Sequence, residues 1–223
     1  MTSRYQHRGS DGRRIELPVG KVVCVGRNYA AHAKELNNPV PDSPLLFIKP
    51  ATALAALLPG LRLPVDQGQV HHEVELALLI GKTLDGGGKI SPHEAIVGVG
   101  IALDLTLRDV QERLKKMGQP WEIAKAFDGA CPCSAFIDAG EFSGLQDIGF
   151  RLELNGEIRQ VGNSQDMLFP VNQLLQAIAG HFTLLPGDIV LTGTPAGVGP
   201  LLPGDRLRLQ IDDRLQVETQ VLY

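Results

Sequence analysis

The alternation of apolar and polar residues predicts a chain built mainly of short strands. Two apolar runs, 22–25 and 45–48, have the length and composition of buried strands. Residues 71–80 alternate briefly and then become continuously apolar, which indicates a strand that is buried on both faces. Residues 148–161 form two strand-like halves around Asn155-Gly156, and this dipeptide is typical of a two-residue hairpin turn.

The segment 96–104 predicts a strand with two unlike faces. Because successive side chains of a strand point to opposite sides, one face carries only branched apolar residues and the other carries mostly small ones. The apolar face consists of Val97, Val99, Ile101 and Leu103, and the small face consists of Gly98, Gly100, Ala102 and Asp104. The small face therefore leaves room for the close approach of another element, and it ends in a carboxylate.

Three segments have the apolar spacing of a helix. They are 28–36, 106–117 with Thr106 as the expected N-cap, and 169–181. The first is short and is followed by the proline-rich stretch 37–44, which ends the helix and is a candidate mobile segment. We therefore expect a helical flap near the N-terminus of a β-rich α+β protein.

The domain organisation follows from the same pattern. Residues 1–14 are polar, and we expect them to be frayed. No repeat, low-complexity tract or interdomain linker divides the rest of the chain. The sequence therefore predicts an N-terminal extension at 1–20 and a single catalytic domain at 21–223.

Composition and charge narrow the class of protein. The chain has 223 residues, of which 43% are hydrophobic and 21% are charged, and these values are typical of folded soluble proteins. The net charge is −4 and no basic stripe appears, so we expect no nucleic-acid partner. No apolar run approaches the ~18 residues that a membrane-spanning helix needs, so we expect no membrane partner.

The cysteines and the N-terminal stretch bear on location. Cys24, Cys131 and Cys133 are odd in number, which favours free thiols in a reducing compartment. Zinc binding by Cys131 and Cys133 is the alternative, but a second ligand pair is missing. The N-terminal stretch has no apolar core typical of a secretory signal, and no amphipathic stripe supports a mitochondrial presequence. The cytoplasm is therefore the predicted location.

The sharpest local signal for chemistry is a pair of glutamates on one strand. In His71-His72-Glu73-Val74-Glu75, the two glutamates point to the same side and lead into a buried apolar run. Two adjacent carboxylates repel each other unless positive charge lies between them, and hard divalent cations prefer such oxygen ligands. Asp104 is a candidate third ligand. The alternative is an exposed strand end, with Asp104 merely preceding a helix.

Several polar residues could act beside such a site. His32 and Glu35 lie on one face of the flap helix, where a carboxylate can orient an imidazole as a general base. Lys125 lies among apolar residues and could neutralise an anionic substrate. Arg108 and Gln111 share one face of the helix after Asp104. Exposed side chains on solvated surfaces are the alternative for each of these residues.

The glycine-rich stretch 192–199 follows an apolar strand. Backbone N–H groups in such a loop can bind a carboxylate, although a plain tight turn is the alternative. It is not a dinucleotide-binding fingerprint, because no G-x-G-x-x-G precedes a helix there. The stretch around Gly81-Lys82-Thr83 is not a phosphate-binding loop either, since Leu76 occupies the position of the first glycine.

In their order along the chain, these segments resemble the fumarylacetoacetate hydrolase (FAH) superfamily. The matching pieces cover nearly the whole chain beyond residue 20 and are Cys24-Val25-Gly26-Arg27-Asn28-Tyr29 with His32 and Glu35, Phe47-Ile48-Lys49-Pro50, His72-Glu73-Val74-Glu75-Leu76, Asp104-Leu105-Thr106 with Arg108, residues 125–132, and Thr192-Gly193-Thr194-Pro195 through Gly199. The small size and the Gly-Arg-Asn-Tyr start look most like the acylpyruvase and oxaloacetate decarboxylase branch. Ala126 departs from the family pattern, which usually has glycine after the lysine.

The resemblance implies a fold, a metal and an assembly. It implies the α+β, β-rich FAH fold, a mixed β-roll or sandwich with a short N-terminal helical lid, usually assembled as a homodimer. It also implies Mg²⁺ or Mn²⁺ held by Glu73, Glu75 and Asp104. By the same resemblance, His32 and Glu35 form a water-activating dyad on the lid, and a further set of residues contacts the substrate. That set is Arg27, Arg108, Gln111 and Thr194, together with Lys125, which the resemblance implies is a third catalytic residue.

The implied activity is that of a metal-dependent hydrolase or lyase acting on small 2-oxo acids. Cleavage next to the 2-oxo acid leaves a pyruvate enolate, and a bound cation can stabilise its charge as a Lewis acid. The same enolate serves acylpyruvate hydrolysis, oxaloacetate decarboxylation and keto–enol tautomerisation. Two alternatives remain, an isomerase or hydratase of dienoic 2-oxo acids in aromatic breakdown, and a non-catalytic metabolite-binding protein of this fold.

Overall fold

Over the residues that the structure describes, the strands form three sheets. The computed structural model describes residues 5–36, 39–88 and 90–223. The largest sheet has eight strands in the order β2-β1-β12-β5-β6-β8-β3, with β9 paired to β6. Its members are β1 (Val22–Gly26), β2 (Leu45–Lys49), β3 (Leu54–Ala56), β5 (Val74–Ile80), β6 (Ile96–Leu103), β8 (Cys131–Cys133), β9 (Ile137–Asp138) and β12 (Ile189–Leu191).

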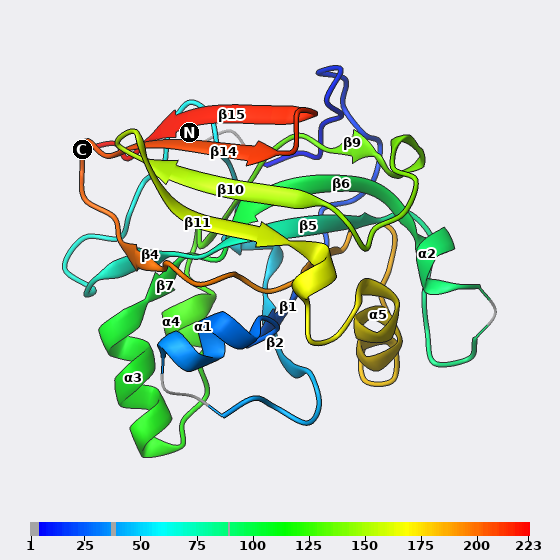
Figure 1. Cartoon of the computed structure of the whole chain (residues 1–223), viewed down its shortest axis with the longest axis horizontal. Coiled ribbons are helices and arrows are strands. Elements are labelled where there is room, and N and C mark those ends of the chain that lie inside the picture. Colours follow the sequence, from blue (N-terminus) through cyan, green and yellow to red (C-terminus); the bar gives the residue numbers. More distant parts are fainter. Residues whose placement is uncertain (1–4, 37–38, 89) are drawn as a thin grey trace.

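A four-stranded antiparallel sheet covers one face of this large sheet. It runs in the order β11-β10-β14-β15, and β10 contacts β5 while β14 contacts β6. In Figure 1 its strands β14 and β15 lie above β5 and β6. Its strands are β10 (Gly149–Leu154), β11 (Glu157–Asn163), β14 (Arg206–Ile211) and β15 (Leu215–Gln220). The hairpin predicted at Asn155-Gly156 is confirmed, with Asn155 at a φ of 54° in the left-handed region.

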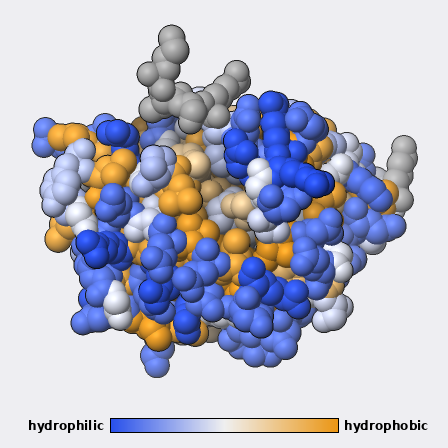
Figure 2. Space-filling model, turned by 90° about the horizontal axis from the view of Figure 1, so that it is seen from above, coloured by the Kyte–Doolittle hydropathy of each residue, from blue (hydrophilic) through white to orange (hydrophobic). Residues whose placement is uncertain are grey.

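The outer side of this four-stranded sheet faces solvent. Burial alternates along β10 and β14, so that every second side chain points into the core. Seen from above in Figure 2, the molecule is mainly hydrophilic, with separate bands of apolar residues.

Within the described ranges, a small three-stranded sheet and five α-helices complete the fold. The sheet runs β13-β4-β7, with β4 at Val70–His72, β7 at Thr106–Leu107 and β13 at Gly199–Pro200. The helices are α1 (Ala30–Glu35), α2 (Pro92–Ala95), α3 (Arg108–Met117), α4 (Glu122–Lys125) and α5 (Val171–Ala179). Three 3₁₀ turns lie at Ala51–Ala53, Ala139–Glu141 and Ser164–Asp166. None of the helices in the described ranges is long and apolar enough to cross a membrane.

Several predicted element bounds are wrong because of strand pairing and local geometry. The strand expected at 71–80 is interrupted at Glu73, which lies between β4 and β5. Thr106 is not an N-cap, because it pairs in β7 opposite His71 and its hydroxyl donates to the carbonyl of Asp104. The helix therefore begins at Arg108. The expected helices at 28–36 and 169–181 are also shorter, since α1 and α5 begin two residues later.

The alternation along β5 and β6 separates two apolar clusters on the two faces of the large sheet. Leu76, Leu78 and Ile101 face the four-stranded sheet, whereas Leu79 and Ala102 face the opposite side. The prediction that the small face of β6 admits a close neighbour is confirmed. A Cβ atom added to Gly98 would lie 2.9 Å from the Cβ of Phe136, and one added to Gly100 would lie 3.0 Å from the Phe136 ring.

The N-terminal stretch is not frayed over its described residues. His7 is buried, and its Nε2 lies 3.1 Å from the carbonyl oxygen of Gly187. Arg8 pairs with Arg14, and Gly9 pairs with Phe136. Tyr5 and Ile15 pack on the second apolar cluster. The stretch is ordered because it covers the face of the large sheet opposite the four-stranded sheet. The polar composition of residues 1–14 gives no sign of this contact.

Candidate active site

Three carboxylates meet where β5 and β6 lie side by side. Glu75 is the second residue of β5 and pairs with Ala102, and Asp104 directly follows β6. The amide of Asp104 donates to the carbonyl of Glu73 at 2.8 Å, which fixes the third carboxylate beside the other two. One oxygen of each carboxylate lies within 4.8 Å of the others, and all three side chains are buried. The alternative of an exposed strand end is therefore wrong.

Two cations neutralise Glu73. Lys125, at the end of α4, places its Nζ 2.7 Å from Glu73 Oε2 and 2.6 Å from Asp104 Oδ2. Arg108, at the start of α3, pairs with the other oxygen of Glu73. Burial acts to raise the pKa of Glu73, but the charges of Lys125 and Arg108 outweigh it and hold that pKa well below its ordinary value.

Lys125 responds in the opposite direction. Burial acts to lower the pKa of Lys125, but the charges of Asp104 and Glu73 outweigh it and raise that pKa above its ordinary value. The ammonium group therefore stays charged at neutral pH, and Lys125 can serve as a hydrogen-bond donor but not as a base. A solvated surface lysine, the alternative considered from sequence, is wrong.

Glu75 has a different environment from Glu73. Within the described ranges, no lysine or arginine pairs with it, and its Oε2 accepts the amide of Gly193 at 2.5 Å. Burial and the charges of Asp104 and Glu73 raise the pKa of Glu75 well above its ordinary value. Glu75 is thus the carboxylate of the cluster that is most short of positive charge.

The cluster fits a hard divalent cation. Its donors are carboxylate oxygens only, which suits Mg²⁺ and Mn²⁺ and not a soft metal. The ammonium of Lys125 lies between Glu73 and Asp104, which shows that these buried carboxylates are stabilised by neighbouring positive charge. Glu75 faces the same cluster without a cation of its own, which leaves a place for one more positive charge.

His32 and Glu35 form a hydrogen-bonded pair on α1. His32 Nδ1 lies 3.2 Å from Glu35 Oε2, and the imidazole is buried against the pocket above the carboxylates. The second oxygen of Glu35 accepts the amide of Gly197 at 2.9 Å. Glu35 therefore orients the imidazole and also ties α1 to the glycine-rich loop. The alternative of two exposed polar side chains is wrong for His32, while Glu35 is partly exposed.

The glycine-rich stretch does bind carboxylates through its backbone, but they belong to the protein itself. Gly193 donates to Glu75 and Gly197 donates to Glu35. Thr194, between them, lines the pocket and donates its hydroxyl to the carbonyl of Val74 at 2.8 Å. The loop therefore positions one carboxylate of the cluster and one member of the histidine pair.

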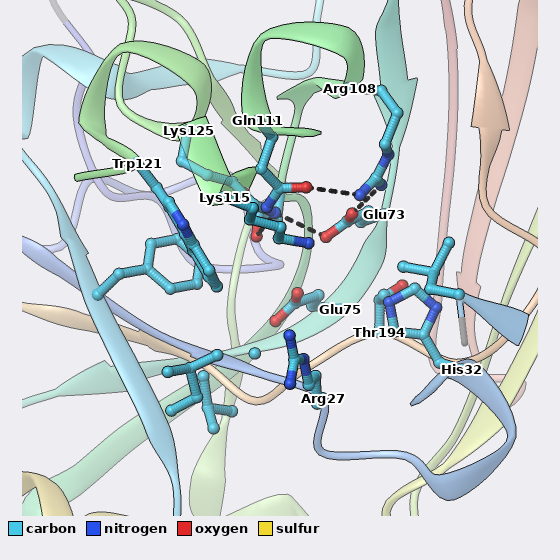
Figure 3. A pocket seen from close by; sticks show the side chains of 16 residues that line it. Arg27, His32, Glu73, Glu75, Arg108, Gln111, Lys115, Trp121, Lys125 and Thr194 are labelled. Carbon is cyan, nitrogen blue, oxygen red and sulfur yellow. Dashed lines mark hydrogen bonds and ion pairs between the residues drawn. The ribbon is translucent and has the colours of Figure 1, made fainter. Parts of the chain in front are cut away.

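Arg108, Gln111 and Arg27 line the same pocket (Figure 3). Arg108 Nη1 donates to Gln111 Oε1 at 2.8 Å, and both side chains are buried. Arg27 lies between β1 and α1 with a φ of 61°, a left-handed conformation that is uncommon for a residue with a side chain. The structure thus brings all ten residues singled out from the sequence to one pocket or, for Glu35, to its histidine.

Two residues that hold this site together were not predicted from the sequence as site residues. Lys49 is fully buried, lies 2.8 Å from Asp104 Oδ1, and donates to the backbone carbonyls of Lys125 and Ala130. Gln160 is also fully buried and accepts from the amide of Val74 at 3.0 Å. The signal for Lys49 was a lysine that continues the apolar run 45–48, where a charge is buried only with partners.

Gln160 joins the carboxylate strand to the glycine-rich loop. Its Oε1 also accepts from His72 Nδ1 at 2.8 Å, and its Nε2 donates to Thr194 Oγ1 at 2.8 Å and to the carbonyl of Pro195 at 2.9 Å. No sequence pattern marked it, because its partners lie far away along the chain.

Comparisons with known proteins agree with this geometry. A family model described as fumarylacetoacetate (FAA) hydrolase C-terminal matches residues 21–222. Oxaloacetate tautomerase YcgM of Escherichia coli (strain K12) is 53% identical over 219 residues, which are 98% of this chain and 100% of that protein.

Two crystal structures have the same fold. A fumarylacetoacetate hydrolase family protein from Yersinia pestis CO92 superposes with a TM-score of 0.94 at 50% identity, over 98% of this chain and 100% of that one. Fumarylpyruvate hydrolase from Pseudomonas aeruginosa, in complex with Mn²⁺ and pyruvate, superposes with a TM-score of 0.89 at 33% identity, over 100% of this chain and 97% of that one.

The predicted FAH resemblance and the β-rich α+β fold are therefore confirmed. The family model spans nearly the whole chain beyond residue 20, and the Escherichia coli relative is similar along almost all of it. This chain belongs to the fumarylacetoacetate hydrolase family.

Proposed function

We propose that this protein is a divalent-metal-dependent enzyme that acts on small 2-oxo acids, with keto–enol tautomerisation and decarboxylation of oxaloacetate as its leading reactions. The observation that carries the proposal is the buried cluster of Glu73, Glu75 and Asp104, with a protonated lysine and a carboxylate-oriented histidine beside it. Its similarity to relatives named oxaloacetate tautomerase supports the choice of substrate.

In this proposal the three carboxylates hold Mg²⁺ or Mn²⁺. The bound cation would supply a Lewis acid that stabilises the negative charge of an enolate oxygen. Lys125 lies against the same carboxylates and stays protonated, so its ammonium can donate to a substrate oxygen on which charge develops. Arg108 and Gln111 hold each other at the wall of the pocket and can orient the substrate carboxylate.

His32 is the residue best placed to move a proton. With Nδ1 donating to Glu35, Nε2 is unprotonated and can accept a proton from the C3 carbon of a 2-oxo acid. Returning that proton to the oxygen or to the carbon completes tautomerisation in either direction. Glu35 stabilises the imidazolium that forms in between, and the Gly197 amide keeps Glu35 in place.

Hydrolysis of acylpyruvates is the second candidate, and the His32–Glu35 pair is the observation that favours it. The same Nε2 could remove a proton from water, which then attacks the distal carbonyl of the substrate. The similarity to a fumarylpyruvate hydrolase that binds Mn²⁺ and pyruvate supports this reading. Oxaloacetate decarboxylation needs neither step, because loss of carbon dioxide leaves the enolate directly.

A substrate panel tests the proposal. Purified protein is assayed with Mg²⁺, with Mn²⁺ and with a chelator against oxaloacetate, acetylpyruvate, fumarylpyruvate and a dienoic 2-oxo acid. We expect metal-dependent interconversion of enol and keto oxaloacetate, and competitive inhibition by oxalate, which mimics a planar pyruvate enolate. Turnover of the dienoic acid alone would favour the isomerase or hydratase alternative. Absence of metal-dependent turnover and of oxalate binding would overturn the proposal.

The remaining sequence expectations stay predictions. They are the division into an extension at 1–20 and a catalytic domain at 21–223, the homodimer and the cytoplasmic location.

A further inference from the structure

Helix α3 brings a third polar side chain to the pocket, besides the two predicted from sequence. Arg108, Gln111 and Lys115 are spaced by three and four residues, so they share one face of the helix, and all three line the pocket. Arg108 and Gln111 bond to each other, and Arg108 also pairs with Glu73. Among the described residues, the Lys115 ammonium has no hydrogen bond or ion pair of this kind.

The ammonium of Lys115 is held by an aromatic ring. Its Nζ lies 5.2 Å from the centroid of the Trp121 ring, within the range of a cation–π interaction. The Trp121 ring packs edge-on against the Phe47 ring, with 6.1 Å between the ring centroids. The Nζ of Lys125 lies 5.2 Å from the centroid of the Phe47 ring. Lys115 and Lys125 therefore each make a cation–π contact with one of two neighbouring aromatic rings, and both lysines line the same pocket.

Two cationic side chains that line the pocket have no ion-pair partner among the described residues. Glu73 and Asp104 already pair with lysine or arginine side chains. Over the ranges that the structure describes, no carboxylate lies within ion-pair distance of Lys115 or of Arg27. Figure 3 shows the charged ends of these two residues on either side of Glu75, both turned toward the interior of the pocket.

The charged form of Lys115 is destabilised in this position. Burial, together with the charges of Arg108 and Arg27, lowers the pKa of Lys115 to about 8. An anionic group of a ligand bound beside Lys115 would relieve this repulsion. Lys115 lies on the α3 wall of the pocket that contains the Glu73–Glu75–Asp104 cluster, so we expect a substrate with its 2-oxo acid end at the cluster to bring its opposite end to Lys115.

We infer that Lys115, held by Trp121 and faced by Arg27, binds the distal carboxylate of the substrate and so selects dicarboxylic over monocarboxylic 2-oxo acids. The inference rests on the proposed function, because the 2-oxo acid end must first bind at the carboxylate cluster. Lys115 is in this view a specificity-determining residue, and Trp121 is a positioning residue that acts through it.

A matched pair of ligands tests the inference without relying on turnover. Malate and lactate are both 2-hydroxy acids, but malate alone carries a distal carboxylate. Their affinities for Mn²⁺-saturated protein are measured by calorimetry in the wild type and in Lys115→Met. We expect the variant to bind malate about tenfold to a hundredfold more weakly, the effect of losing one charge-assisted hydrogen bond, and to bind lactate and oxalate unchanged.

Three further variants control the experiment. Lys116→Met removes the same charge from the neighbouring exposed position and is expected to leave the malate affinity unchanged. Lys115→Arg keeps the charge and is expected to retain most of the discrimination between malate and lactate. Trp121→Leu leaves the lysine unsupported, and an intermediate loss of malate affinity is expected, with lactate again unchanged.

The outcomes separate this inference from the proposed function. If oxalate binds the wild type in a metal-dependent manner but Lys115→Met weakens malate and lactate equally, or neither, the distal subsite is wrong and the proposed function stands. If oxalate fails to bind at all, the proposed function itself is wrong. A malate affinity that falls as far in Lys116→Met as in Lys115→Met would also overturn the inference.

Discussion

Glu73 and Glu75 are two residues apart, yet the protein treats their charges differently. Glu73 pairs with Lys125 and Arg108, whereas Glu75 is repelled by Asp104 and Glu73. In chelator, Glu73→Gln is therefore expected to lower the free energy of unfolding by about 3–5 kcal/mol, because it leaves Arg108 without a carboxylate partner and Lys125 with Asp104 alone. Glu75→Gln is expected to raise it. Thermal unfolding of both variants beside the wild type checks this, and a loss of stability in both would contradict it.

The same contrast predicts a dependence on pH. Folding raises the pKa of Glu75, so the folded protein binds more protons than the unfolded chain above the ordinary glutamate pKa of about 4.3. The contribution of Glu75 to stability therefore falls as the pH rises through this window. In chelator, the advantage of Glu75→Gln over the wild type should grow between about pH 5 and pH 8. If the difference in unfolding free energy between Glu75→Gln and the wild type were constant with pH, the pKa of Glu75 would be the same in the folded and unfolded states.

Lys49 is a buried charged residue whose removal is expected to lower the stability of the fold. It is fully buried, pairs with Asp104 and donates to two backbone carbonyls. Lys49→Met keeps the length of the side chain but leaves these groups unsatisfied, so we expect it to lower the free energy of unfolding by about 3–5 kcal/mol. Urea denaturation is the measurement. The matched control is Lys82→Met at an exposed position, expected within about 0.5 kcal/mol of the wild type.

At the scale of elements, α1 and the glycine-rich loop act as one unit, since Glu35 joins them. His32→Ala is expected to suppress tautomerisation and acylpyruvate hydrolysis by roughly 10²- to 10⁴-fold, the contribution of a positioned acid–base group. Decarboxylation should fall far less, because no proton must leave C3 before the carbon–carbon bond breaks. Lys34→Ala, exposed on the same helix, is the control.

The split between these reactions decides the role of His32. Equal loss of all three activities in folded, metal-loaded His32→Ala would show that the histidine acts through closure of α1 over the pocket or through protonation of the enolate. Unchanged hydrolysis and tautomerisation would remove His32 from the catalytic residues.

At the scale of the whole molecule, the N-terminal segment covers one of two apolar clusters. That cluster contains Cys24, Cys131 and Cys133, which are buried free thiols. Removing residues 1–14 takes away Tyr5 and His7, both of which lie against it. We expect the truncated protein to melt at a lower temperature and to react faster with a thiol reagent. Labelling at the wild-type rate would mean that this segment contributes nothing to the cover.

The strands and the acidic pair could be predicted from sequence because both signals are local. Continuous apolar runs predicted β1 and β2, alternation predicted β6 and the start of the segment 71–80, and Asn155-Gly156 predicted the β10–β11 turn. Glu73 and Glu75 were visible as two carboxylates two residues apart, although the structure interrupts the strand at Glu73. The error at Thr106 has a tertiary cause, since its pairing with His71 across the three-stranded sheet overrode its preference for a helix start.

Which side chains meet was decided only by the tertiary structure. Gly193 reaches Glu75 across 118 residues because β12 pairs with β5. Lys125 reaches Glu73 across 52 residues because α4 packs against α3, β7 and β2. The sequence by itself determined the period of each element and the residues that could carry chemistry, since both depend on neighbours a few positions away. Burial, charge pairing and the pKa of each carboxylate depend on partners far along the chain, and therefore they were settled by the packing of the sheets.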